Sequence, residues 1–403
     1  MRKSLGLAAL AALLLCGTAS AQQINVKIGV LTDMSSLYAD DTGPGSVIAA
    51  KLAAEDFMKS HPNVKVEVVS ADHQNKADAG TNIVNQWIDR DGVDMVADVP
   101  NSGVALAISE VIRAKNKVFV ASGPASSDLT GPKCSPNTVH WTYDTWMLAN
   151  GTGKAIVKSG GDTWFFLTSD YAFGHALERD TAAVVEKSGG KVLGKVRHPI
   201  NTNDFSSFLL QAQSSKAKVI GLANAGGDTI NAIKQGAEFG IVAGGQKFAG
   251  LLIFAPDVAA LGLKTAQGLT FTETWYWDLN DGTRAWTKRW DKERNSAGKL
   301  PSMNMAGVYS GTLHYLKAVA AVGSSKDGAK VVEEMKKLPA EDSIYGKSTV
   351  RVDGRVLHPA YLFEVKKPEE SKYPGDLYNI KATIPPEEAF RPLKDGNCPL
   401  VKG

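Results

Sequence analysis

The sequence predicts an α/β fold built from two doubly wound parallel-sheet lobes. The first observation is that short apolar runs rich in Val and Ile alternate with stretches whose apolar residues recur at helical spacing. The second is that this alternation stops over residues 138–150 and restarts near residue 162. The third is size, because 403 residues, 43% of them hydrophobic and 22% charged, can bury two globular cores.

The first half of the chain alternates between strand and helix patterns. One helix is expected where Val47, Ile48 and Leu52 form an apolar face and Lys51 and Glu55 a polar one. Strands separated by such helices form right-handed β-α-β units, and these build a parallel sheet covered on both faces. Strands are expected at 25–32, 64–70, 93–99 and 118–121, and helices at 44–57, 79–90 and 104–114.

The second half repeats the pattern and then changes. Strands are expected at 164–168, 192–196, 219–223, 250–255 and 269–274, and helices at 176–188, 204–214 and 228–239. Helical patterns follow at 283–297, 303–322 and 329–338, before strands at 348–352 and 360–365. Ligands of open parallel sheets bind at the carboxyl ends of the strands, so the cleft between the two lobes is the expected binding site.

The N-terminal residues predict export. Arg2 and Lys3 precede an apolar run too short to span a bilayer, and Ala19-Ser-Ala21 is the small-x-small pattern of a signal peptidase site. We expect a signal peptide at 1–21, cleavage before Gln22 and a periplasmic location. A lipoprotein would use Cys16, but the preceding position holds Leu15 instead of a small residue.

Two cysteines, Cys134 and Cys398, remain after the predicted cleavage. In an exported protein an even number of cysteines favours a disulfide over free thiols. We therefore expect a Cys134–Cys398 bridge that holds the proline-rich C-terminal tail against the loop around Cys134. The alternative is a pair of unreactive free thiols.

Charge and motifs argue against several classes of protein. Lys and Arg number 45 against 42 Asp and Glu, so there is no electrostatic case for binding nucleic acid or an anionic membrane. The segment Gly43-Pro-Gly45 has Ile48 where a dinucleotide-binding loop needs its third glycine. Ser215 and Lys218 have Ser-x-x-Lys spacing but precede a predicted strand instead of starting a helix. We expect no enzyme activity, no cofactor and no metal.

Several segments together resemble the periplasmic solute-binding proteins of ABC importers, in the branch of the leucine/isoleucine/valine receptors. They are Lys27-Ile-Gly-Val-Leu-Thr-Asp33, residues 98–107, 121–130 and 170–174, Pro256-Asp257, and residues 307–318. The resemblance implies a type I clamshell of two lobes joined by three hinge crossings, and a monomer. It divides the chain into residues 22–143 plus 277–343 for lobe 1, 144–276 plus 344–380 for lobe 2, and 381–403 for a C-terminal tail.

The expected ligand site combines helix starts with residues implied by the resemblance. Asn101 and Ser102 begin a helix, whose free N–H groups can hold a carboxylate, and Ser126 offers a second such turn. For each serine the alternative is a simple N-cap of the helix. The resemblance also implies that Phe173 covers the ligand and that Asp257 pairs with an amino group, unless Asp257 only caps a helix. The complete set of expected ligand contacts is Tyr38, Asn101, Ser102, Pro124, Ser126, Tyr171, Phe173, Asn224 and Asp257.

The expected ligand class depends on the aromatic residues and on the resemblance. Aromatic residues cluster at 141–146 and 275–277, where they either pack the hinges or line a cleft for a flat ring. The resemblance favours a small carboxylate, with an aromatic acid such as a benzoate or hydroxycinnamate ahead of a branched-chain or other amino acid or an amide. The protein would deliver this ligand to a membrane permease, or, as an alternative, present it to a membrane receptor as a sensor.

Overall fold

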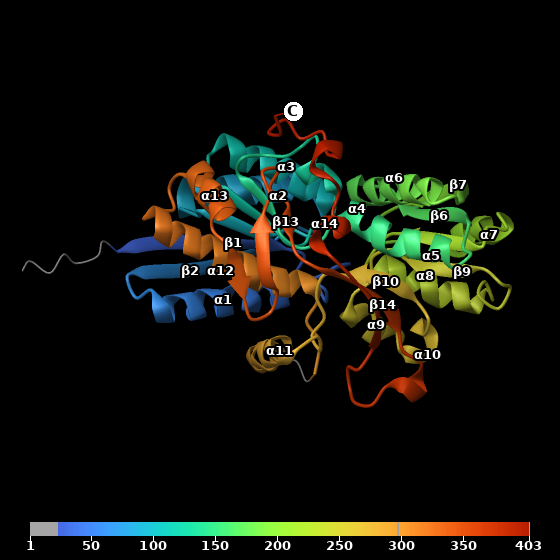
Figure 1. The fold of residues 1–403 in the computed structure, drawn as a ribbon. Helices are drawn as coiled ribbons and strands as arrows, with labels where there is room; N and C mark the ends of the chain where they lie inside the picture. Colours follow the sequence, from blue (N-terminus) through green and yellow to red (C-terminus); the bar gives the residue numbers. More distant parts are fainter. Residues whose placement is uncertain (1–22, 296–297, 403) are drawn as a thin grey trace, which may run out of the picture.

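The computed structural model describes residues 23–295 and 298–402. The predicted signal peptide, its cleavage site and Cys16 lie outside the described residues. Figure 1 shows two α/β lobes side by side, one built mainly from the first part of the chain and the other from the middle part. Among the described residues no helix combines the length and hydrophobicity needed to cross a bilayer.

The first lobe contains a five-stranded parallel sheet in the order β2-β1-β3-β4-β5. Its buried strands consist largely of Val, Ile and Ala, which suits a sheet covered on both faces. Helices α2 and α3 pack on one face, while α12 and α13 pack on the other, with α1 lying against α12. The strands are β1 (Ile24–Thr32), β2 (Val64–Asp72), β3 (Met95–Asp98), β4 (Val118–Ala121) and β5 (Thr138–His140), and the helices are α1 (Gly43–Ser60), α2 (Ala77–Gln86), α3 (Ser102–Ala114), α12 (Met303–Val322) and α13 (Gly328–Lys337).

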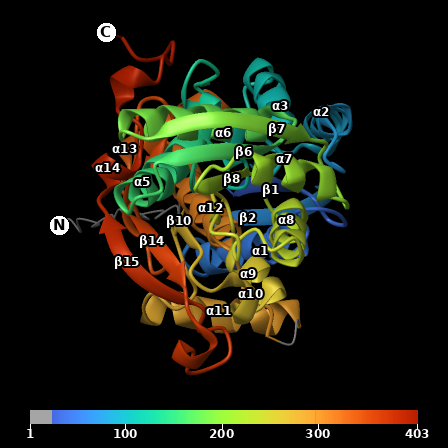
Figure 2. The same ribbon diagram turned by 90° about the vertical axis from the view of Figure 1, so that its right-hand side faces the viewer.

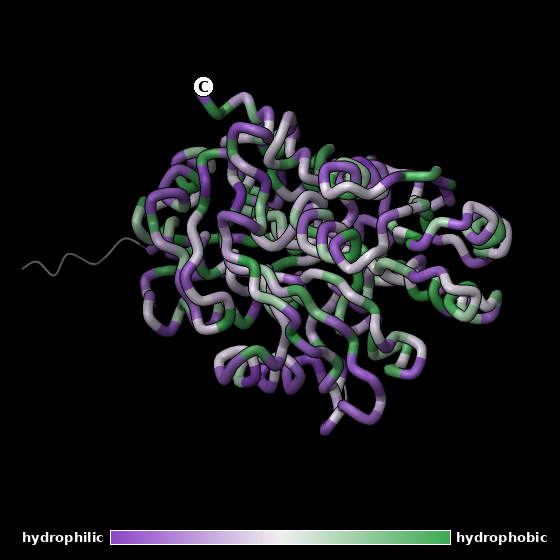
Figure 3. The backbone as a smooth tube through the Cα atoms, turned by 45° about the vertical axis from the view of Figure 1, so that its right-hand side comes forward, coloured by the Kyte–Doolittle hydropathy of each residue, from purple (hydrophilic) through white to green (hydrophobic). Residues whose placement is uncertain are grey.

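The second lobe contains a four-stranded parallel sheet in the order β7-β6-β8-β9. Alternate residues of β6 face opposite ways, so Trp164 and Phe166 join the core under α6 while Phe165 and Leu167 join the core under α7 and α8. Figure 2 looks at this lobe from the front. The strands are β6 (Thr163–Ser169), β7 (Lys191–His198), β8 (Val219–Ala223) and β9 (Lys247–Gly250), and the helices are α5 (Lys154–Lys158), α6 (Ala172–Lys187), α7 (Ser206–Ser214) and α8 (Gly227–Glu238). The hydrophobic positions concentrate along the inner strands of both lobes (Figure 3).

Two small antiparallel sheets complete the fold. One has the order β10-β14-β15, and the other the order β11-β12-β13, with Arg355 bridging to His140 at the edge of the first sheet. Their strands are β10 (Thr270–Glu273), β14 (Ala360–Val365), β15 (Tyr378–Ile384), β11 (Ala340–Asp342), β12 (Gly346–Val350) and β13 (Val356–Leu357). The remaining helical segments are α4 (Thr145–Leu148), α9 (Ala255–Leu261), α10 (Leu263–Ala266), α11 (Asp281–Arg294), α14 (Pro386–Ala389), η1 (Trp87–Asp91), η2 (Ser127–Thr130), η3 (Ala149–Gly153), η4 (Pro368–Glu370) and η5 (Leu393–Asp395).

One expected strand was misplaced, and another formed with a partner that the sequence did not specify. The expected strand at 250–255 lies instead at Lys247–Gly250, because α9 begins at Ala255, with Pro256 in its first turn, and the apolar residues before it are buried in the core and the cleft. The expected strand at 269–274 forms as β10, but it pairs antiparallel with β14 instead of extending the parallel sheet. An apolar run in the sequence indicates a buried segment, but it does not indicate which strand that segment pairs with.

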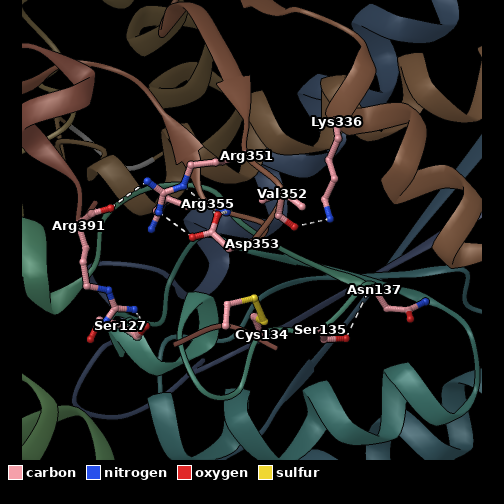
Figure 4. The surroundings of a disulfide bond; sticks show 11 residues. Ser127, Cys134, Ser135, Asn137, Lys336, Arg351, Val352, Asp353, Arg355 and Arg391 are labelled. Carbon is pink, nitrogen blue, oxygen red and sulfur yellow. Dashed lines mark hydrogen bonds and ion pairs between the residues drawn. A yellow bond between two sulfur atoms is a disulfide. The ribbon is translucent and has the colours of Figure 1, made fainter. Parts of the chain in front are cut away.

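The C-terminal tail is fastened to the first lobe. Cys134 and Cys398 form the expected disulfide, with their Cα atoms 5.6 Å apart. Nearby, Arg391 of the tail donates to the Ser127 carbonyl over 2.9 Å, and Arg351 donates to the Arg391 carbonyl over 2.8 Å (Figure 4). The bridge and these two hydrogen bonds fix the tail against the loop that carries Ser127.

Removing the bridge should destabilise the protein. The paired cysteines are 264 residues apart, and closing a long loop typically contributes about 2–4 kcal/mol to the free energy of unfolding. We expect the Cys134→Ser/Cys398→Ser variant to lose about that much in a urea titration. Wild-type protein in reductant serves as the control and should unfold at the same midpoint as the variant. Equal unfolding midpoints for oxidised and reduced wild-type protein would contradict a stabilising Cys134–Cys398 disulfide.

Candidate functional site

A cavity lies between the two lobes, and both lobes contribute its walls. The side chains leave free room of only about 10 Å³ inside it, on the order of one water molecule. None of the lining residues is Lys, Arg or His. The first-lobe side supplies Tyr38, Asp41, Thr42, Pro100, Gly123, Ala125, Tyr143 and Asn304, and the second-lobe side Tyr171, Phe173, Ala225, Leu252 and Phe254.

The lining residues come together because of the parallel sheets. All of them except Asn304 follow the carboxyl end of a strand by at most about ten residues, namely β1, β3, β4, β5, β6, β8 or β9. Parallel strands end at the same edge of a sheet, so their following loops converge there. Asn304 comes from the first turn of α12, whose N-cap Ser302 accepts from the Asn304 N–H over 3.1 Å.

A strained turn brings the start of α3 to the cavity. Asp98 and Val99 adopt φ values of 77° and 66°, a left-handed conformation that is unfavourable for a β-branched residue such as Val. The turn redirects the chain from β3 into Pro100, which lines the cavity, and then into α3. The positive end of the α3 dipole therefore lies beside the cavity, where it favours an anionic group.

Asp98 is buried beneath this turn. Burial raises the pKa of its carboxyl to about 7, although the hydroxyls of Thr32, Ser46 and Ser122 partly oppose the shift. The side chain has no exposed surface, and a Cβ atom added at Gly123 would lie 2.6 Å from Asp98 Oδ1. Only glycine at 123 therefore lets the loop after β4 approach Asp98 this closely.

The three residues expected to hold a carboxylate organise the wall of the cavity. Asn101 is the N-cap of α3, since its Oδ1 accepts from Gly103 N over 2.9 Å and from Val104 N over 3.1 Å. Ser102 Oγ accepts from the backbone N–H groups of Ala125 and Ser126, over 3.3 and 3.2 Å. The Ser126 hydroxyl in turn accepts from the Asp128 N–H at the start of η2. Ser102 fastens the β4 loop to α3, and all three residues lie next to the lining residues instead of among them.

The two tyrosines expected at the site meet across the cleft. The hydroxyls of Tyr38, after β1, and Tyr171, after β6, are hydrogen-bonded to each other. Burial raises the pKa of both phenols, so both remain neutral at physiological pH. Phe173 lies with its ring centroid 5.8 Å from that of Tyr171 and forms the apolar part of the second-lobe wall.

The other expected contacts have internal partners. Asn224 is buried, donates to His198 Nε2 over 3.1 Å and accepts from Thr229 Oγ1 over 2.7 Å, and its neighbour Ala225 lines the cavity instead. The Pro124 carbonyl faces His140 Nε2 at 2.7 Å.

Asp257 serves as a helix cap in the structure. Its Oδ2 accepts from Phe254 N over 3.0 Å at the start of α9. Burial raises the pKa of Asp257 to about 7, and the hydrogen bond from Phe254 partly opposes this. Asp257 lines an adjoining pocket together with Asp41, which also lines the main cavity.

A second set of contacts joins the lobes beside the cavity. Asp180 of α6 accepts from Ser127 Oγ of the first lobe over 2.7 Å, and it also accepts from Thr145 Oγ1 of its own lobe over 2.6 Å. Arg179 donates to Ser127 Oγ over 3.0 Å and pairs with Asp128 at 3.1 Å. Together with the tyrosine pair, these contacts hold the lobes against each other.

Sequence reasoning missed several lining residues. Of the two aromatic clusters, Tyr143 alone lines the cavity, while Trp275 packs edge-on against Trp286 in the core. The other lining residues outside the expected set are Asp41, Thr42, Pro100, Gly123, Ala125, Ala225, Leu252, Phe254 and Asn304. Their position just after strand ends was the available signal for all except Asn304, which belongs to a helix far along the chain. Among the described residues no cluster of His, Cys, Asp or Glu could hold a metal ion.

Comparisons with known proteins agree on the class of protein. A family model described as "Periplasmic binding protein" matches residues 25–372. A crystal structure of a periplasmic binding protein from Burkholderia mallei is 50% identical, with a TM-score of 0.90 over 94% of this chain and 99% of that one. A branched chain amino acid ABC transporter periplasmic ligand-binding protein from Burkholderia xenovorans is 39% identical, with a TM-score of 0.81 over 93% and 99%. A Leu/Ile/Val-binding protein homolog 6 from Brucella melitensis is 26% identical over 92% of this chain and 95% of its own.

The raised pKa of Asp98 predicts a pH-dependent stability. Between about pH 4 and pH 7 the folded protein retains a proton that the unfolded chain has released, so stability falls as the pH rises through this window. Asp98→Asn cannot titrate and should gain stability relative to wild type over the same range. Urea titrations of both proteins at pH 4, 5, 6, 7 and 8 measure the difference, and a difference independent of pH would contradict the prediction.

The tyrosine pair predicts a measurable contribution to lobe closure. Tyr38→Phe and Tyr171→Phe each remove the same hydrogen bond, worth about 0.5–1.5 kcal/mol, so the double variant should behave like either single one. We expect each to increase the radius of gyration in small-angle X-ray scattering by favouring open molecules. Tyr143→Phe is the control, because its hydroxyl bonds the Gly123 carbonyl within the first lobe. Equal scattering from all variants would refute the role of the pair.

Proposed function

The chain belongs to the periplasmic binding protein family, and on that premise we propose that it captures a small carboxylate ligand, an aromatic acid such as a benzoate or hydroxycinnamate derivative, in the cleft between its lobes. Proteins of this family bind small molecules and deliver them to the permeases of ABC importers. Family membership implies an exported, periplasmic protein. We further propose the lobe boundaries 22–143 plus 277–343 and 144–276 plus 344–380, with a tail at 381–403.

The composition of the cavity wall carries the proposal of an aromatic acid. Five rings line the cavity, and they surround a space with no cationic side chain. Rings on both sides of a cleft favour a flat apolar body, which they contact over its faces and edges. The ring-lined space adjoins the first turn of α3, whose dipole favours a carboxylate there, although Asn101 already caps the Gly103 and Val104 N–H groups. The rings belong to Tyr38, Tyr143, Tyr171, Phe173 and Phe254.

Ligand binding should be coupled to closure of the two lobes. The free room in the cavity is about 10 Å³, much less than a benzoate needs, so the lobes or the wall side chains must move for a ligand to enter. A ligand that contacts both walls favours the closed arrangement by its differential affinity for it. The closed protein then presents surfaces of both lobes together, which the permease can recognise as the sign of bound ligand.

An amino acid is the second candidate, and buried carboxyl groups favour it. Asp41 lines the main cavity, and both Asp41 and Asp257 line the adjoining pocket. A carboxylate at this position is a suitable partner for an ammonium group. The similarity to the periplasmic ligand-binding protein of a branched chain amino acid ABC transporter is consistent with this candidate.

A thermal-shift screen of the mature protein tests the proposal. The protein is first unfolded and refolded to remove any carried ligand, then mixed with benzoates, hydroxycinnamates, branched-chain and aromatic amino acids, and small amides. A ligand at about 100 times its Kd adds about 2.7 kcal/mol of stability, enough to raise Tm by about a degree or more. We expect stabilisation by aromatic acids. Stabilisation only by amino acids would replace the first candidate with the second, and stabilisation by no carboxylate would refute both.

A further inference from the structure

The C-terminal tail begins on the second lobe. Strand β15, which precedes it, pairs with β14 in the sheet β10-β14-β15. Phe363 and Tyr378 of this sheet belong to the same hydrophobic core as Leu222 of the second lobe's parallel sheet. Beyond β15, Asn150 of η3, which packs against α6, donates from Nδ2 to the Glu388 carbonyl over 2.8 Å. The chain is therefore attached to the second lobe as far as α14, which lies at the junction of the lobes in Figure 1.

The next residue of the tail covers the hinge. The Phe390 ring lies over the guanidinium of Arg355, with its centroid 4.6 Å from Cζ, and it meets the His358 ring edge-on with centroids 5.3 Å apart. Arg355 has no exposed surface, and its Nη1 donates to the Tyr143 carbonyl over 3.1 Å and pairs with Asp144 Oδ2 at 3.4 Å. The proposed lobe boundaries place the first crossing between Tyr143 and Asp144, and Arg355 follows the third crossing. Phe390 therefore packs on the side chain that links two crossings.

The rest of the tail is attached to the first lobe. Arg391 donates from Nη2 to the Ser127 carbonyl over 2.9 Å, and Cys398 is bonded to Cys134 in the loop that follows η2 (Figure 4). Arg391 follows Glu388, the last residue fixed to the second lobe, by three positions. An extended chain covers at most about 11 Å over that distance. The tail therefore passes from one lobe to the other with little slack.

The residue that the tail holds also joins the lobes. Ser127 Oγ donates to Asp180 over 2.7 Å and accepts from Arg179 Nη2 over 3.0 Å, and both of these residues belong to α6. A Cβ atom added at Gly131 would lie 2.7 Å from Arg391 Nη2, so the tail packs closely on the loop that carries Ser127. By fixing the Ser127 backbone, the tail also positions its hydroxyl for the contact with α6.

We propose that the disulfide-bonded tail is a fourth connection between the lobes, which stabilises their closed arrangement and makes ligand affinity depend on the redox state of Cys134 and Cys398. The disulfide keeps Phe390 and Arg391 at a high effective concentration beside their partners in the hinge and in the first lobe, so these contacts re-form readily after they break. Without the disulfide, the tail can leave the first lobe while it remains attached to the second.

Reduction of the bridge needs an external dithiol. Two electrons and two protons pass from the dithiol to the sulfur atoms of Cys134 and Cys398, the S–S bond between them breaks, and the dithiol itself becomes a disulfide. Cys398 is buried and Cys134 is partly exposed, so the dithiol attacks at the Cys134 side of the bridge. The effect on affinity rests on the proposed function, whereas the effect on the lobes does not.

Small-angle X-ray scattering of the ligand-free mature protein tests the fourth connection. Oxidised protein is compared with protein reduced by dithiothreitol, a thiol count confirms the reduction, and circular dichroism confirms that both forms are folded. We expect a larger radius of gyration after reduction, because the lobes open more readily. The Cys134→Ser/Cys398→Ser variant is the control, which should match the reduced protein and should not respond to dithiothreitol.

A second variant tests the connection with the disulfide intact. Arg391→Leu removes the hydrogen bond to Ser127 and should increase the radius of gyration of the oxidised protein. Arg113→Leu is its matched control, because Arg113 pairs with Glu110 within α3 and does not bridge the lobes, so the radius should not change. An unchanged radius in both the reduced protein and Arg391→Leu would overturn the proposal.

Calorimetric titration with benzoate and with leucine tests the dependence of affinity on the disulfide. For whichever compound binds, reduction should raise Kd by about threefold or more, because a smaller fraction of the protein is closed. The difference should vanish in the Cys134→Ser/Cys398→Ser variant. An unchanged Kd would overturn the redox dependence of affinity. If neither compound binds, the proposed ligand classes fail, and the scattering experiment still decides whether the tail connects the lobes.

Discussion

Parallel strands send all their carboxyl ends to one edge of a sheet, and this constraint determines where the protein can bind a ligand. Both sheets direct that edge toward the same cleft, so the loops after β1, β3, β4 and β5 face those after β6, β8 and β9. The Tyr38–Tyr171 hydrogen bond joins a residue that follows β1 to one that follows β6. The site is therefore built from two halves, each held by its own lobe, and it is complete only when the lobes meet.

The ionisable side chains that line the cleft are carboxyls and phenols. Its wall has no basic side chain, whereas Asp41 lines it and Asp98 and Asp257 are buried close by. Burial raises the pKa of each of these carboxyls, so part of their charge is suppressed in the folded protein. The α3 N-terminus then recognises an anionic group of the ligand, while the Asp41 carboxyl can accept from a donor group of the ligand. This division of roles favours a ligand with an acidic group and a donor on a compact apolar body.

Much of the fold could be predicted from sequence, because the buried faces of strands and helices place apolar residues at regular spacings. The alternation of strands and helices predicted both parallel sheets, and the even cysteine count predicted the disulfide that the structure contains. The pairing of β10 with β14 could not be predicted, because the partner strands are 90 residues apart and an apolar run carries no register. For the site, Tyr38, Tyr171 and Phe173 of the expected ligand contacts line the cavity, whereas Asn304 was missed because only the tertiary fold brings α12 to the cleft.

A crystal structure of the mature protein with the tightest-binding small carboxylate of the screen tests the central claim most directly. The account predicts a ligand enclosed between the lobes, with its carboxylate near Pro100, Gly123 and the first turn of α3, its body against Tyr171 and Phe173, and both lobes in contact with it. A ligand bound to one lobe only, or in a groove away from the ends of the parallel strands, would contradict the account.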